Sequence, residues 1–85
     1  MEEISLGTVV HYFHKPMVAA VKIENGLLAL GDVVHFKGRT TDLHHRVDSL
    51  QIENQPVGTG RSGDVVGIRV AGRVRARDRV AKVVE

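Results

Sequence analysis

The apolar residues of this chain come in short, valine-rich runs separated by glycine-containing turns, and this pattern restricts the possible folds most. Nowhere do apolar residues recur every 3.6 positions over the length of a helix, so we expect no long helix. Valine and other β-branched residues favour the pleated backbone of a strand. The sequence therefore predicts an all-β protein, and its 85 residues suit a single domain, residues 1–85.

Six extended segments can be drawn between the turn signals, and the polar stretch Gln55–Gly63 is expected to be a loop. The segments are Ile4–Phe13, Met17–Glu24, Val33–Lys37, Leu43–Glu53, Val65–Val70 and Arg79–Val84. In the fourth segment, the spacing from Val47 to Leu50 breaks the alternation of strand side chains, which predicts a β-bulge near Asp48-Ser49. Six short strands with glycine turns favour a closed six-stranded barrel, because closure leaves no exposed edge.

Alternation along these segments also predicts the core, because every second side chain of a strand faces the same side. The residues expected to face inward are Met17, Ala19, Val21, Ile23, Val34, Phe36, Val47, Leu50, Ile52, Val66, Ile68 and Val70. Most of them are aliphatic, so a single apolar interior is expected.

The tetrapeptide GDVV occurs twice, at Gly31–Val34 and at Gly63–Val66. In each copy the glycine is expected to take a positive φ at a tight turn, where other side chains are strained. The next residue, Asp32 or Asp64, would bond nearby backbone amides, and the valines would begin a strand. The repeat therefore predicts two equivalent structural corners, and an acidic catalytic pair is the less favoured alternative.

Positive charge is concentrated in the second half of the chain. The net charge is +2, but residues 1–38 have a balance of −1 and residues 39–85, which contain every arginine, a balance of +3. Four arginines at alternate positions would share one side of an extended segment, about 6.6 Å apart. They are Arg73, Arg75, Arg77 and Arg79, and the turn residues Arg61, Arg39, Lys37 and Lys15 could extend the surface. Such a surface could bind RNA phosphates, with an ordinary solvated surface as the alternative.

No pattern in the sequence predicts a catalytic, metal or cofactor site. Without cysteine there is no disulfide and no thiolate ligand. The adjacent His44 and His45 would point to opposite faces of a strand, so no metal site is expected. Ser49 and Ser62 have no evident histidine and acid partners for nucleophilic catalysis, so no enzyme is expected. Residues 58–63 fit G-x-G-x-x-G but lead into a strand, whereas a dinucleotide fingerprint opens a helix. We therefore expect no cofactor.

The N-terminal residues are acidic and lack the basic region and apolar run of a signal peptide. No stretch approaches the roughly 18 apolar residues that a membrane helix needs. The sequence therefore predicts a soluble, cytoplasmic protein with no membrane partner.

Four segments of the chain form a recognisable set: LALGD, SLQIENQPV, GDVVGIRV and the basic ending RVRARDRV. Through these segments, residues 4–84 resemble the second, β-barrel domain of translational GTPases of the elongation factor Tu and 1-alpha type. The resemblance implies a Greek-key-type translation-protein barrel, here in a stand-alone elongation-factor-like protein. Because the chain has no G-x-x-x-x-G-K-[ST] loop, GTP binding is not expected.

The resemblance and the arginines together predict a non-enzymatic, translation-associated module that contacts ribosomal RNA or tRNA. The alternative is a protein-interaction module. In that case the surface that packs on a GTPase domain in the resembled family would bind another protein or a second copy of this chain. A third option is an accessory subunit that completes a larger enzyme.

Overall fold

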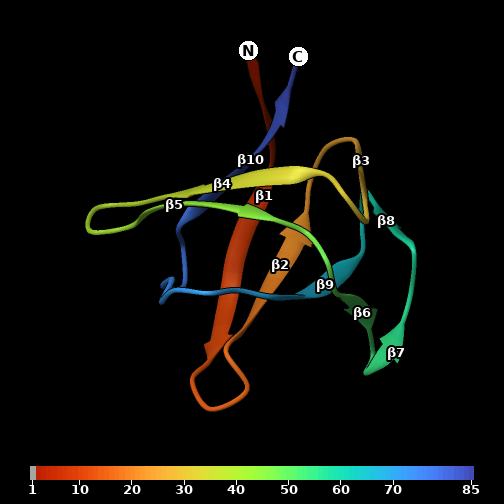
Figure 1. Cartoon of the computed structure of the whole chain (residues 1–85), viewed down its shortest axis with the longest axis horizontal. Coiled ribbons are helices and arrows are strands. Elements are labelled where there is room, and N and C mark those ends of the chain that lie inside the picture. The colour runs from red at the N-terminus through yellow and green to blue at the C-terminus, as the bar shows by residue number, and fades with distance from the viewer. Residues whose placement is uncertain (1) are drawn as a thin grey trace.

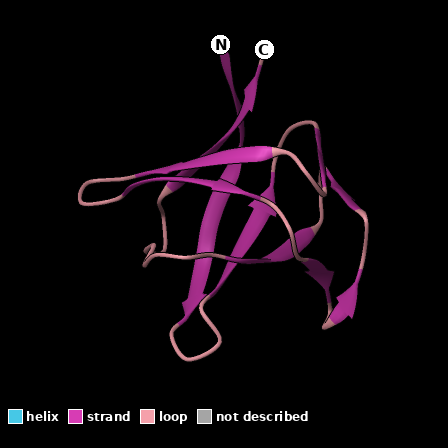
Figure 2. Ribbon diagram, viewed as in Figure 1, coloured by secondary structure: helices cyan, strands magenta, loops and turns pink. Residues whose placement is uncertain are grey.

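The computed structural model describes residues 2–85 and leaves Met1, the first residue of the predicted domain, outside. All regular elements in this part of the chain are strands (Figures 1 and 2). They are β1 (Glu2–Phe13), β2 (Val18–Ile23), β3 (Leu27–Ala29), β4 (Val33–Lys37), β5 (Asp42–Arg46), β6 (Leu50–Ile52), β7 (Gln55–Pro56), β8 (Thr59–Arg61), β9 (Val65–Arg69) and β10 (Arg79–Val84). The predicted all-β class is confirmed.

Eight strands form one sheet, and the other two form a short ribbon. The order across the large sheet is β5-β4-β10-β1-β2-β9-β6-β7, and β3 pairs with β8. β1 lies at the centre because its first half pairs with β10 and its second half with β2 (Figure 1). Register shifts at Ser5/Gly7 and at Val9/His11 interrupt these pairings, and such irregularities increase the local twist. The sheet therefore curls around a single compact interior.

The predicted closed six-stranded barrel is wrong. Among residues 2–85, the sheet ends at β5 and at β7, and these two strands do not pair with each other. The fourth predicted segment is the main cause, because it is not one strand. Its first part is β5, which pairs with β4, and its second part is β6, which pairs with β9 and β7. The expected loop 55–63 contains two further short strands, β7 and β8.

The break between β5 and β6 explains the irregular apolar spacing, and the bulge that this spacing predicts near Asp48-Ser49 is absent from the described ladders. Val47 is fully buried, its N–H donates to the Asp32 carbonyl at 2.8 Å, and its carbonyl accepts from the Gly31 N–H at 2.8 Å. These hydrogen bonds attach Val47 to the corner before β4, at the point where the chain passes from β5, which pairs with β4, to β6, which pairs with β9. The spacing from Val47 to Leu50 therefore marks a crossover rather than an extra residue within a ladder.

The core is aliphatic except for Phe36, and most of its predicted members are confirmed. The predicted residues that are at most 3% exposed are Ala19, Val21, Ile23, Val34, Phe36, Val47, Leu50, Val66, Ile68 and Val70. Ile52 is partly buried against this cluster. The assignment of Met17 is wrong, since it is 37% exposed in the β1–β2 turn with a φ of 57°. A left-handed turn residue does not continue the alternation of the strand that follows it.

Both GDVV copies form tight corners of the same geometry. Gly31 has a φ of 93° and Gly63 a φ of 99°. The Oδ2 atoms of Asp32 and Asp64 accept hydrogen bonds from the backbone N–H three residues earlier, at 2.8 and 3.0 Å respectively. The corners lead directly into β4 and β9.

A third corner of this geometry precedes β10, and the sequence repeat does not reveal it. Asp78 Oδ2 accepts from the Arg75 N–H at 2.8 Å, and the Asp78 N–H donates to the Arg75 carbonyl at 3.1 Å. The position equivalent to glycine is occupied by Arg77, whose φ is 78°. Three equivalent corners thus begin three strands of the large sheet.

Candidate functional site

Four ionisable side chains gather on the outer face of the sheet formed by β1, β10, β4 and β5. Glu3 comes from β1, His35 from β4, and Asp42 and His44 from β5. We call this group the carboxylate–histidine cluster. The sequence does not predict this cluster, because its adjacent histidines point to opposite faces of a strand and the cluster forms between residues of different strands.

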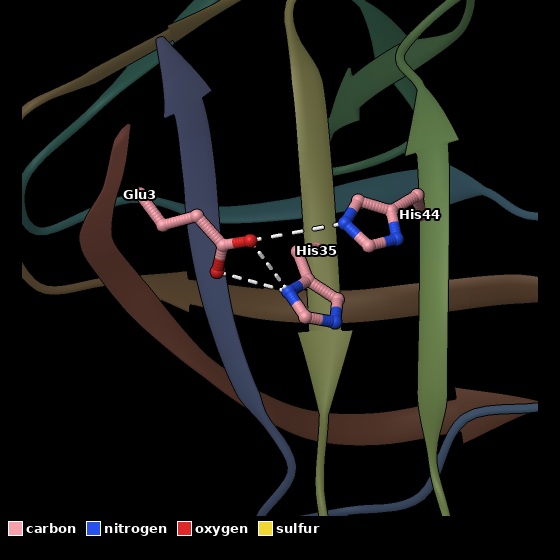
Figure 3. Close-up of side chains that lie close together, drawn as sticks. All are labelled: Glu3, His35 and His44. Atoms are coloured by element: carbon pink, nitrogen blue, oxygen red, sulfur yellow. Dashed lines mark hydrogen bonds and ion pairs between the residues drawn. The ribbon is translucent and has the colours of Figure 1, made fainter. Parts of the chain in front are cut away.

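Strand register brings the cluster together. His35 lies opposite His44 in the β4–β5 pair and opposite Ala81 in the β4–β10 pair. Residues that are directly opposite in a ladder share a face of the sheet. Glu3, which is opposite Val83, extends its side chain across β10 towards the two imidazoles (Figure 3). The small side chain of Ala81 leaves room for this approach.

His35 is held on three sides. Its Nδ1 lies 2.9 Å from both carboxylate oxygens of Glu3, and its Nε2 lies 2.6 Å from Oδ1 of Asp42. The ring of His44 stacks on it, with ring centres 3.9 Å apart and an interplanar angle of 11°. As a result His35 is only 7% exposed, although it is on the outer face.

The cluster stabilises positive charge at His35. The hydrogen bond to Glu3, and then that to Asp42, raises the pKa of His35 above its ordinary 6.5, although desolvation opposes the shift. The same hydrogen bonds from His35 lower the pKa of the Glu3 and Asp42 carboxyls, again against desolvation. Both carboxylates are therefore ionised at neutral pH, and they favour a cation between them.

An open depression of about 890 Å³ lies beside the cluster. It is lined by Glu3, Gly31, Asp32, Val33, His44, Lys82, Val83, Val84 and Glu85. Lys82 Nζ lies 3.4 Å from Oδ2 of Asp32 and donates to the Leu27 carbonyl at 2.9 Å. The lining therefore carries both signs of charge, and solvent has access to the Glu3 and His44 side of the cluster.

A second concave surface of about 550 Å³ lies over β2, β9 and β6, and we call it the β2–β9 groove. It is lined by Phe13, Pro16, Val18, Ala20, Gln51, Glu53, Asn54, Val65, Val66 and Gly67. Its floor is low because the paired residues Ala20 and Gly67 have little or no side chain. Phe13 is 48% exposed and Val65 45% exposed, so the groove presents apolar walls to solvent.

The alternating arginines do not form the extended stripe that their spacing predicts. They are Arg73, Arg75, Arg77 and Arg79, of which only the last lies in a strand. Arg75 donates from Nε to Thr40 at 3.1 Å, whereas Arg79 donates to Thr8 at 2.6 Å, on a different element. The turn before β10 therefore sends these side chains in different directions.

The other four residues assigned to RNA binding lie in three segments of the chain. Lys15 is in the β1–β2 turn, Lys37 and Arg39 are at the β4–β5 hairpin, and Arg61 is in β8 (Figure 1). The eight residues assigned to RNA binding therefore come from four segments of the chain: the β1–β2 turn, the β4–β5 hairpin, β8 and the stretch that ends in β10.

The G-x-G-x-x-G stretch, residues 58–63, has a packing role. It contains β8 and leads into β9 rather than a helix. A Cβ added at Gly60 would lie 2.6 Å from Cγ1 of Val66 and 3.1 Å from Cδ1 of Ile23. Close packing over the core therefore accounts for the glycine at this position.

Comparison with solved structures identifies the fold. The C-terminal domain of a Geobacillus thermoleovorans protein described as a U32 peptidase superposes with a TM-score of 0.84 at 20% identity, covering 95% of this chain and 92% of that domain. A selenomethionine variant of the same domain gives a TM-score of 0.82 at 19% identity, covering 89% of this chain and 95% of the other. The chain therefore has the fold of that domain.

Two curated relatives are named as peptidases. An uncharacterised protease of Methanocaldococcus jannaschii is 33% identical over 79 residues, and a collagenase of Porphyromonas gingivalis is 31% identical over 80 residues. These alignments cover 92% and 93% of this chain, but the chain spans only 19% of the length of either relative. No protein-family model matches the chain.

These comparisons correct the resemblance to translation factors. The solved neighbour is a domain of a protein described as a U32 peptidase, and the curated relatives are named as a protease and a collagenase, so the assignment to a stand-alone elongation-factor-like protein is wrong. The translation-associated RNA-binding function rested on that resemblance and is wrong with it. The prediction that the chain is not an enzyme is not confirmed, because its curated relatives are named as a protease and a collagenase, although it spans only a fifth of either. Within residues 2–85 there is no helix suited to crossing a membrane.

Proposed function

We propose that this domain works in proteolysis by a U32-type peptidase and holds a segment of unfolded polypeptide in the β2–β9 groove. The observation that carries the proposal is the match of nearly the whole chain to about a fifth of a protease and of a collagenase. A segment of that size can bind a substrate without containing the machinery that cleaves it. The domain would thus contribute to substrate capture rather than to bond cleavage.

The chemistry of the groove supports a polypeptide as the occupant. Its apolar walls, including Phe13 and Val65, can cover aliphatic side chains of an extended segment. The amide side chains of Gln51 and Asn54 can donate to and accept from a peptide backbone. An unfolded chain presents both kinds of group, whereas a folded protein hides most of its apolar residues.

Fluorescence anisotropy with labelled gelatin and labelled unfolded casein tests the proposal. We expect saturable binding of both unfolded probes and none of a folded protein of similar size. Phe13→Ser removes an apolar wall and should weaken binding at least fivefold. Because Phe13 is about half exposed, this change should have little effect on folding.

Ile4→Ser is the matched control. Ile4 lies near the opposite end of β1, is 47% exposed, and is not part of the groove. Binding that is absent, or that falls equally for Ile4→Ser and Phe13→Ser, would refute the groove as the polypeptide site.

A further inference from the structure

Three potential metal ligands converge in the carboxylate–histidine cluster. They are a carboxylate oxygen of Glu3, Nδ1 of His35 and Nε2 of His44, and they all lie within 4.8 Å of one another. We propose that this cluster binds one divalent ion of the zinc class, with Glu3, His35 and His44 as ligands and Asp42 as the outer partner of His35. Two imidazoles and one carboxylate are a ligand set that open zinc sites in proteins use.

The distances between the ligand atoms fit an ion of this size. A tetrahedral zinc ion with bonds of about 2.05 Å holds its ligand atoms about 3.3 Å apart. His35 Nδ1 lies 2.9 Å from Glu3 Oε2, and His44 Nε2 lies 3.7 Å from the same oxygen. These two separations lie on either side of the required value, so Glu3 is at a suitable distance from each imidazole.

Asp42 gives His35 the tautomer that metal binding needs. Its Oδ1 is 2.6 Å from His35 Nε2, so when Nδ1 gives up its proton to bind the ion, the remaining ring proton stays on Nε2. The lone pair of Nδ1 then lies in the plane of the ring and faces Glu3. A carboxylate that accepts from the far nitrogen of a ligating histidine is a common outer partner at metal sites, where it fixes the ring and increases its basicity.

One ring has to turn. The two imidazoles are nearly parallel, with centres 3.9 Å apart, and a metal ion lies close to the plane of each ring that ligates it. Parallel planes at this separation cannot share an ion, so one ring must rotate about its side-chain torsions. His44 is the ring that can do so, because its side chain is 57% exposed whereas that of His35 is 9% exposed.

The surroundings favour an ion with an open coordination position. Glu3 and Asp42 supply two negative charges to the cluster, and neutral imidazoles add none. The 890 Å³ depression adjoins Glu3 and His44, so a fourth position on the ion faces solvent. A site with three protein ligands and one open position can bind water or an anionic group such as a carboxylate. This inference is independent of polypeptide binding in the β2–β9 groove.

Calorimetric titration of the tag-free, EDTA-dialysed domain with zinc chloride tests the proposal. We expect one zinc ion per chain. His44→Gln and Glu3→Gln should each weaken binding at least tenfold, because each removes one of three ligands without disturbing the core. Asp42→Asn should weaken binding about 10- to 100-fold through the orientation of His35. Cobalt absorption spectra of the wild-type domain should show the intense visible bands of a four-coordinate ion.

His14→Gln is the control, since His14 is an exposed histidine in the β1–β2 turn. It should leave zinc affinity unchanged. The proposal is overturned if no zinc binds, if His44→Gln retains wild-type affinity, or if His14→Gln weakens binding as much as His44→Gln does. Circular dichroism of each variant must show a folded domain. Because His44→Gln and Glu3→Gln change two different exposed ligands, the test does not depend on the folding of a single variant.

Discussion

Arg77 has a left-handed backbone, with a φ of 78°, at the position that glycine occupies in the two other corners. For a residue with a side chain this conformation costs about 1–2 kcal/mol. Neighbouring bonds hold it there, since the Arg77 N–H donates to the Val9 carbonyl at 2.7 Å and Asp78 closes the turn onto Arg75. The strain is therefore offset by the attachment of the corner to β1.

Replacement of Arg77 by glycine should stabilise the domain. The relief of left-handed strain exceeds the added flexibility of the unfolded chain, so we expect the free energy of unfolding to rise by about 0.5–1 kcal/mol. Urea denaturation followed by far-ultraviolet circular dichroism measures the change. In contrast, Gly63→Ala should lower stability by about 1–2 kcal/mol, because Gly63 has a φ of 99°. A loss of stability in Arg77→Gly would show that its side chain contributes more than its backbone strain costs.

β1 organises the sheet at the scale of the elements, because it is the one strand that joins β10 to β2. Gly7 is at the changeover, opposite Val80 in β10 and opposite Ile23 in β2. A Cβ added there would collide with the backbone carbonyl of Lys22. Backbone atoms of a paired strand cannot rotate away as a side chain can, so the close approach of β1 and β2 requires glycine.

Gly7→Ala should therefore destabilise the domain by about 2–3 kcal/mol, since the clash forces the two strands apart. The shift of the urea midpoint at constant slope gives the value. Gly58→Ala is the matched control, because a Cβ at Gly58 would meet nothing within 4 Å. It should be neutral or slightly stabilising. Equal effects of the two substitutions would contradict the role assigned to Gly7.

The whole molecule depends on one interior, to which nearly every strand contributes an aliphatic side chain. Phe36 has the largest of the fully buried side chains. A domain of this size has a net stability of only about 5–15 kcal/mol. The loss of one large core residue therefore removes a substantial share of the total, and the domain should unfold as one unit.

The two phenylalanines provide a test at this scale. Phe36→Ala leaves a cavity and should cost about 3–5 kcal/mol. Phe13→Ala, which truncates a side chain that is 48% exposed, should change stability by less than about 0.5 kcal/mol. Chemical denaturation monitored by circular dichroism and by Tyr12 fluorescence should give coincident single transitions. Separate transitions would show that the sheet does not surround one cooperative core.

The candidate site could not be predicted from the sequence, for a physical reason that its residues show. Glu3 and His35 are 32 positions apart, and they meet only because β10, the last strand, inserts between β1 and β4. His35 and His44 meet through a hairpin register that places them directly opposite each other. Within the sequence, only His44 and His45 are adjacent histidines, and the alternation of a strand separates these two. The family was also misidentified, because valine runs and glycine-aspartate corners occur in more than one kind of small β domain.

Local patterns in the sequence determined the all-β class, most strand positions and the alternation that fills the core, because each depends on residues within a few positions of one another. Tertiary structure alone decided the pairing order, the crossover at Val47, the open ends of the sheet and the third corner. The third corner has Arg77 where the other two have glycine, so the sequence repeat does not mark it. It also decided which charged side chains gather on the outer face. These features depend on which distant strands become neighbours, and that outcome is set by how the whole sheet curls around a shared interior.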